Sequence, residues 1–153
     1  MATGWLIERE DRDFLATPTA PVFAAPRDFQ PPPSMSLRGI LTVEDQGNMG
    51  SCVGHGGSSG LENLQYLANG GRVPMSRMAM YLLAQQASGI RGDQGATISG
   101  CVKAMAEIGC CEEAAYPYPS RYTSNIPQSA IRAAGRHKIL GHQKLRTYRE
   151  VFD

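Results

Sequence analysis

The stretch Gln46-Gly-Asn-Met-Gly-Ser-Cys52 decides the fold prediction, because it ends in a cysteine at the expected start of a helix. That helix is predicted from Ser51 to about Asn69, where Asn69-Gly-Gly provides a stop. The apolar residues within it recur with helical spacing and give it one buried side: Val53, Leu61, Leu64, Tyr66 and Leu67. Unpaired amides and the positive end of the dipole at such a terminus stabilise a thiolate, which lowers a thiol pKa from about 8.5. The stretch therefore predicts a reactive thiol in the first turn of a helix.

Four glycines inside the same segment argue against a helix on propensity alone: Gly54, Gly56, Gly57 and Gly60. Each costs about 0.5–1 kcal/mol relative to alanine in a helix interior. Two interpretations remain open. Either the glycines allow close packing against a neighbouring backbone, or the segment begins as a glycine-rich loop and becomes helical only later.

Residues 46–52 resemble the papain-like cysteine peptidases, whose members carry Gln-Gly-x-x-Gly-Ser-Cys immediately before a long central helix. The resemblance implies that Cys52 is the nucleophile. It also implies that the side-chain amide of Gln46 joins the backbone N–H of Cys52 in holding the oxyanion. A lone Gly-Ser-Cys is usually explained by a buried structural cysteine, whereas the spacing to Gln46 favours the nucleophile.

Further segments extend the resemblance across most of the chain and bring it closest to the bacterial and viral branch without a long propeptide: residues 4–6, 11–14, 34–38, 109–113 and 116–118. Residues 92–98 resemble the family's glycine-containing loop, whose backbone pairs with an extended substrate in strand-like fashion. The resemblance implies that Asp93, Gln94 and Gly95 bind substrate, with Gly95 as the residue of close approach. A simple turn is the alternative for these three residues.

The chain also departs from the family pattern, because the familiar Cys-Gly-Ser-Cys-Trp is Met49-Gly-Ser-Cys-Val53 here. The change removes an aromatic residue and a cysteine often used in a disulfide, which agrees with a reducing environment. Free thiols are therefore expected at all four cysteines: Cys52, Cys101, Cys110 and Cys111. Cysteine and histidine spacings do not fit a zinc site, and no metal or cofactor is expected.

A catalytic base is the missing part of the resemblance. The family's His and Asn lie about 130–150 residues after the cysteine, which from Cys52 is about position 182 or later, and the chain has 153 residues. His55 lies one helical turn from Cys52 on a shared face, whereas the family's base comes from the opposite, strand-rich half. His137 and His142 are interpreted as surface or packing residues.

The fold prediction is α+β, namely the mainly helical half of a papain-like fold whose β-rich half is missing. Residues 1–33 are expected to form an extended arm, because prolines there fix φ and remove backbone donors; a disordered tail is the alternative. Residues 34–153 are expected to form the N-terminal half of a peptidase domain, truncated at its C-terminus. Further helices are predicted from Ser76 to Ser88-Gly89, from Thr97 to Ile108 and near 127–137, with Pro127 in the first turn of the last one. A short strand is predicted at 138–145, followed by the start of a helix at 147–153.

Composition narrows the choice of partners and location. The formal net charge is +1 without a clustered basic face, so nucleic acid is not an expected partner. No apolar run reaches the roughly 18–20 residues of a membrane span, and no signal peptide is recognised, so a cytoplasmic or particle-associated location is expected.

Two functions fit these patterns. The resemblance implies a thiol peptidase that acts on a peptide or protein through a Cys52 thioester and is incomplete without His and Asn. The alternative is a non-catalytic structural or assembly module, for example a component of a larger particle. An apolar face covered by a protein partner or by the missing half is expected.

Overall fold

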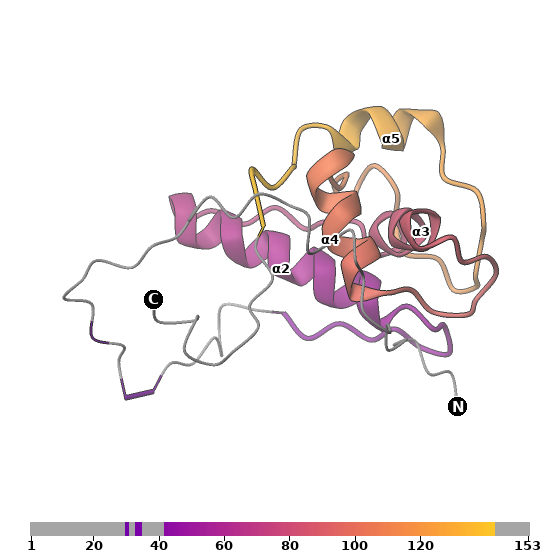
Figure 1. Cartoon of the computed structure of the whole chain (residues 1–153), viewed down its shortest axis with the longest axis horizontal. Coiled ribbons are helices and arrows are strands. Elements are labelled where there is room, and N and C mark those ends of the chain that lie inside the picture. The colour runs from indigo at the N-terminus through magenta and orange to yellow at the C-terminus, as the bar shows by residue number, and fades with distance from the viewer. Residues whose placement is uncertain (1–29, 31–32, 35–41, 143–153) are drawn as a thin grey trace.

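The structure is a computed structural model that describes residues 30, 33–34 and 42–142. Within these residues the helices are α2 (Cys52–Asn69), α3 (Arg77–Ser88), α4 (Ile98–Glu107) and α5 (Gln128–Ala134), labelled as in Figure 1. Within the described ranges Met75 and Glu112 form an isolated antiparallel bridge, and Ala96 is a further isolated bridge residue. The described part is therefore mainly helical, as predicted. None of its helices is long and apolar enough to span a membrane.

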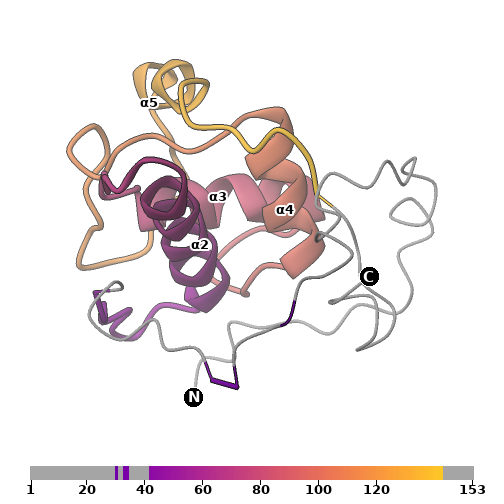
Figure 2. The same cartoon turned by 90° about the vertical axis from the view of Figure 1, so that its left-hand side faces the viewer.

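Helix α3 is the most deeply buried element and contacts both α2 and α4. Met78, Met80 and Tyr81 on α3 are fully buried. Helix α5 lies at the top of both views, away from α2 (Figure 1 and Figure 2), and packs its alanines Ala130 and Ala134 with a second small group of buried residues that includes one alanine of α3. The core therefore surrounds α3, and α2 packs on it from outside.

The glycines of α2 divide into two kinds. A Cβ at Gly54 would lie 2.6 Å from Arg77 O and 2.7 Å from Tyr81 Cβ, and one at Gly57 would collide with Cys101 Sγ. Gly56 and Gly60 have nothing within 4 Å of such an atom. The helix interpretation is confirmed and the loop interpretation is wrong, because residues 52–69 are helical throughout. The predicted buried side is correct for Val53 and Leu61 and wrong for three residues, which are exposed: Leu64, Tyr66 and Leu67. Close packing accounts for two of the four glycines.

The helices predicted at 76–88 and 97–108 are confirmed as α3 and α4. Ser76 is the N-cap of α3, and its side chain accepts a hydrogen bond from Ala79 N–H. Gly89 ends α3 in the left-handed region with φ +69°, where glycine carries no Cβ penalty.

Two predicted elements differ from the structure. The helix near 127–137 is shorter, because α5 ends at Ala134 and turn bonds follow it, and Pro127 is its N-cap rather than a residue of its first turn. The predicted strand at 138–145 is wrong for residues 138–142, which form no strand. There Ile139 N–H donates to Met105 O at 3.2 Å, so the chain follows the end of α4 instead of pairing with a strand.

Several predictions fall on residues outside the described ranges. They are the arm at 1–33 apart from residues 30 and 33, the matches at 4–6, 11–14 and 35–38, the end of the predicted strand at 143–145 and the helix start at 147–153.

Candidate active site

Cys52 is the first residue of α2, and its thiol is free and partly exposed. At 18 residues, α2 is the longest helix in the described part of the chain. Its first turn contains no acidic residue, so no carboxylate within that turn opposes a negative charge on the sulfur. His55 N–H donates to Ser51 O at 3.0 Å as the first helical bond. The N–H of Cys52 precedes that bond, as expected for the orphan amides of a helix start.

Gln46 lies in the loop that leads to Cys52, and its side chain is already oriented by hydrogen bonding. Its Nε2 donates to Met49 O at 2.8 Å. Its backbone carbonyl accepts from Tyr118 O–H at 3.0 Å. A side-chain amide carries two N–H donors, so one donor of Gln46 remains for another acceptor.

Asp93 connects the glycine-containing loop to the loop before Cys52. Its Oδ1 accepts from Gly50 N–H at 2.9 Å and from Tyr81 O–H at 2.8 Å. Burial and the hydrogen bond to Asp93 raise the pKa of Tyr81, so its hydroxyl stays protonated and donates. Asp93 therefore lies beside the candidate nucleophile loop as a hydrogen-bond acceptor.

Gly95 is buried and has φ +85°, in the left-handed region. Its N–H donates to Tyr81 Oη at 3.0 Å, and its carbonyl accepts from Gln85 Nε2 at 2.9 Å. Both of its backbone polar groups are thus engaged inside the protein. Gln94 is exposed, and its N–H donates to Gly92 O at 2.9 Å. The structure brings Asp93 to the loop before Cys52, whereas the polar groups of Gly95 face α3.

His55 and His137 make polar contacts with residues other than Cys52. His55 Nδ1 lies 3.1 Å from Ser51 O, its ring meets Tyr118 edge-on at 4.8 Å, and its Nε2 is buried without a hydrogen-bond partner among the described residues. His137 lies between Gln65 at 3.1 Å and Glu112 at 3.5 Å. No hydrogen bond joins a histidine to Cys52 within the described ranges.

Two tyrosines for which the sequence predicts no role contact the segments next to Cys52. The Tyr118 hydroxyl lies 2.5 Å from Ser51 Oγ, across 67 positions of sequence. The Tyr81 hydroxyl is hydrogen-bonded to Asp93 and to Gly95 N–H. The Tyr-Pro-Tyr at 116–118 is visible in the sequence, but nothing local to it indicates which tyrosine turns toward Cys52.

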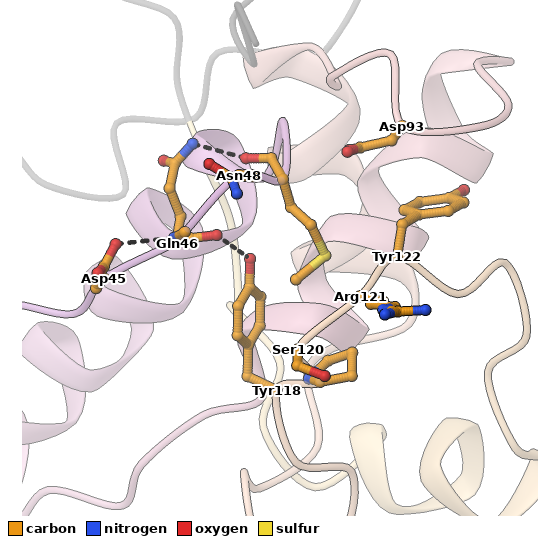
Figure 3. Close-up of a pocket in the computed structure, with 11 residues that line it drawn as sticks. Asp45, Gln46, Asn48, Asp93, Tyr118, Ser120, Arg121 and Tyr122 are labelled. Carbon is orange, nitrogen blue, oxygen red and sulfur yellow. Dashed lines mark hydrogen bonds between the residues drawn. The ribbon is translucent and has the colours of Figure 1, made fainter. Parts of the chain in front are cut away.

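A pocket of about 720 Å³ adjoins this loop. Figure 3 shows Gln46 and Asp45 on one side of it and Asp93 and Tyr122 on the other, with Tyr118 below Gln46. Its lining comes from two loops and one aspartate: residues 45–49, residues 118–122 and Asp93. Cys52 is not part of the lining, although Gln46, Met49 and Asp93 connect the pocket to the loop that precedes it.

The structure is similar to that of xylellain, a cysteine protease from Xylella fastidiosa. The TM-score is 0.65 at 20% sequence identity, over 94% of this chain and 58% of that chain. The fold is papain-like. A structure from a study of the mite allergens Blo t 1 and Der p 1 is also similar, with a TM-score of 0.55 at 20% identity over 69% of this chain and 37% of that chain. The sequence matches no protein-family model and no curated protein.

The papain-like fold that the resemblance of residues 46–52 implies is confirmed by these neighbours. The chain spans little more than half the length of xylellain and about a third of the allergen structure. At 20% identity the likeness concerns the fold alone. The roles of Cys52, Gln46 and residues 93–95, and the bacterial or viral branch, stay predictions.

Proposed function

We propose that this chain carries the nucleophile-bearing part of a papain-like thiol peptidase, with Cys52 as the nucleophile. The observation that carries the proposal is the position of Cys52 as the first residue of α2, after a loop in which Gln46 is oriented by Met49 and Tyr118. The Cys52 N–H and the remaining N–H of Gln46 are the two donors proposed for the oxyanion.

The proposed reaction is acyl transfer through a thioester. The Cys52 thiol gives its proton to an imidazole, sulfur bonds to the peptide carbonyl carbon, and the C–N bond breaks as the amine takes that proton. Water then hydrolyses the thioester and releases the acid. No histidine of the described part is hydrogen-bonded to Cys52, and we propose that His and Asn come from outside residues 1–153, from a continuation or another chain. We also propose that 34–153 form one half of the peptidase domain.

The glycine-containing loop is the proposed substrate-binding segment. Because Gly95 N–H donates to Tyr81 Oη, strand-like pairing through that N–H requires the hydroxyl to be displaced. The Gly95 carbonyl accepts one hydrogen bond from Gln85 and retains a second lone pair. Exposed Gln94 and the Gly95 carbonyl are therefore the groups proposed to meet an extended peptide, with Asp93 at the edge of the pocket.

The test uses two substrates that differ in the leaving group. p-Nitrophenyl acetate expels p-nitrophenolate, which leaves without protonation, whereas a peptide amide needs general acid catalysis worth about 10²–10⁴-fold in rate. The 153-residue chain is expected to form an acetyl thioester at Cys52, located by intact mass and peptide mapping, and to show no turnover of a fluorogenic peptide. Cys52→Ala is expected to abolish the thioester. A chain whose Cys52 is not acetylated would contradict the proposal.

A non-catalytic assembly module is the second candidate. It is favoured by the absence of a hydrogen bond between Cys52 and a histidine of the described part. It is also favoured by the exposed apolar side chains Leu64, Leu67 and Ile98, which a protein partner is proposed to cover. This candidate predicts self-association or partner binding that Cys52→Ala leaves unchanged. Sedimentation velocity of the chain and of Leu67→Ser separates the two: a monomer in both cases removes the support for assembly.

A further inference from the structure

We propose that Tyr118 is a positioning residue that holds the two candidate oxyanion donors, the side chain of Gln46 and the N–H of Cys52, in one arrangement. The inference rests on the proposed function. Tyr118 reaches both sides of the nucleophile loop: its hydroxyl lies 3.0 Å from Gln46 O and 2.5 Å from Ser51 Oγ. Gln46 carries one donor, and Ser51 directly precedes the residue that carries the other.

The directions of these hydrogen bonds follow from the chemistry of the groups. Because a carbonyl oxygen can only accept, the Tyr118 hydroxyl donates its single hydrogen to Gln46 O. Ser51 Oγ must then donate to Tyr118 Oη. His55 Nδ1, 3.1 Å from Ser51 O, carries a hydrogen and donates to that carbonyl. Ser51 Oγ also lies 3.4 Å from His55 Nδ1, a longer contact than its 2.5 Å to Tyr118 Oη.

The side chain of Ser51 is bonded to Tyr118 instead of capping α2. Ser76 and Thr97 are the N-caps of α3 and α4, and both side chains accept a first-turn N–H, from Ala79 and from Gly100. Ser51 is the N-cap of α2 and makes no such bond. A serine cap would normally occupy an N–H of the first turn. With its hydroxyl turned to Tyr118, Ser51 does not occupy a first-turn amide of α2 with its own side chain.

Tyr118 is itself fixed from behind. Its N–H donates to Glu113 Oε1 at 2.6 Å, and Glu113 Oε2 accepts from Arg77 N–H at 3.2 Å. Its ring meets the ring of His55 at an interplanar angle of 81°. Burial raises the pKa of Tyr118, so its hydroxyl remains a donor over the neutral range. Tyr118 is thus bonded through Glu113 to the start of α3, which fixes the position of its hydroxyl relative to residues 46–51.

The experiment compares two reactions of Cys52 in the 153-residue chain. In acetylation by p-nitrophenyl acetate, sulfur bonds to the carbonyl carbon, the aryl C–O bond breaks, p-nitrophenolate leaves with the electron pair and the thiol proton goes to water. The carbonyl oxygen becomes an oxyanion on the way. Alkylation by iodoacetamide displaces iodide and forms no oxyanion. The ratio of the two rates therefore reports the oxyanion donors separately from the accessibility of the thiol.

Tyr118→Phe keeps the ring and removes only the hydroxyl. It is expected to lower the ratio about ten-fold, less than the roughly 10²–10³ lost when a donor is deleted outright. Gln46→Ala deletes a donor and shows that the assay detects one. Tyr116→Phe is the matched control, because the Tyr116 hydroxyl donates to Asn125 O at 2.7 Å, outside the loop before Cys52; it should leave the ratio unchanged within about two-fold, the spread expected of a distant surface change.

Ser51→Ala tests the same bond from its other end and carries the test if Tyr118→Phe does not fold. It should also lower the ratio, and the double variant should add less than the sum of the two single effects, because they share one hydrogen bond. If Gln46→Ala lowers the ratio while Tyr118→Phe and Ser51→Ala do not, the positioning role is overturned and the proposed function stands. If the unmodified chain is not acetylated at Cys52, the proposed function fails and this inference fails with it.

Discussion

Replacing Gly54 with alanine tests how closely α2 must approach α3. The added Cβ would lie 2.6 Å from Arg77 O, 2.7 Å from Tyr81 Cβ and 2.9 Å from Tyr81 N. Carbon atoms pack best at about 3.5–4.0 Å. Two of the three contacts are with backbone atoms of α3, so no side-chain rotation relieves them. The two helices must separate locally, and Tyr81 must move with its bonds to Asp93 and Gly95.

The expected cost follows from two opposing effects. Overpacking of this kind costs about 1–3 kcal/mol, and alanine returns about 0.5–1 kcal/mol in a helix interior. We expect a net loss of about 1–2 kcal/mol, equivalent to about 2–8 °C in Tm for a chain of this size. Gly56→Ala is the matched control in the same helix, because nothing lies within 4 Å of its added Cβ. It should raise Tm by about 1–4 °C.

Thermal unfolding followed by circular dichroism measures both variants. Gly54→Ala should also lower the ratio of Cys52 acetylation to alkylation, because Tyr81 O–H and Gly50 N–H share the same oxygen of Asp93. A Gly54→Ala chain as stable as Gly56→Ala would refute the close contact between α2 and α3 as the reason for this glycine.

Three further outcomes are expected. Iodoacetamide at neutral pH should label Cys52 alone, counted by intact mass, because the other three thiols are at most 3% exposed; labelling of a second thiol before unfolding would contradict this burial. Burial raises the pKa of the Cys101 thiol to about 12, so the folded state keeps a proton that the unfolded chain loses above about pH 8.5. The free energy of unfolding should therefore fall between about pH 8.5 and about pH 12, by about 1.4 kcal/mol per pH unit for each such thiol. Urea unfolding at about pH 8 and about pH 10 measures that fall, which Cys101→Ala should reduce and which a flat profile would exclude. Glu62→Gln should cost about 3–5 kcal/mol by urea unfolding, because Glu62 is 1% exposed and lies 3.4 Å from the guanidinium of buried Arg77; the exposed Glu107→Gln should change stability by less than about 0.5 kcal/mol, and equal effects of the two would refute the role of the ion pair.

The parts of the fold that the sequence predicted are those fixed by neighbouring residues. Ser76 caps the amide three residues ahead of it, and Gly89 stops α3 with its own backbone, so both signals lie within one helical turn. In α2 as well, Cys52 directly follows its N-cap Ser51, and Gly70 ends the helix in the left-handed region. Local chemistry of this kind is visible in a short window of sequence.

The parts that could not be predicted depend on partners far along the chain. A strand needs another strand to pair with, and residues 138–142 instead bond to the end of α4. The two glycines of α2 that matter are distinguished from the two that do not only by where α3 and α4 pack. Tyr118 meets Gln46 across 72 positions, and no periodicity carries that information.

In the proposed reaction the oxyanion donors and the acid–base group come from different segments. The proposed nucleophile and both candidate oxyanion donors lie within residues 46–52, in a segment that hydrogen bonds join to Tyr118 and Asp93. Tyr118 is bonded in turn to Glu113, and Asp93 to buried Tyr81. Within the described residues no histidine is hydrogen-bonded to Cys52 as a base. Oxyanion donors contribute about 10²–10³-fold each, and an acid–base group about 10²–10⁴-fold. A chain that is acetylated by an activated ester and leaves amides intact would therefore possess the first contribution without the second.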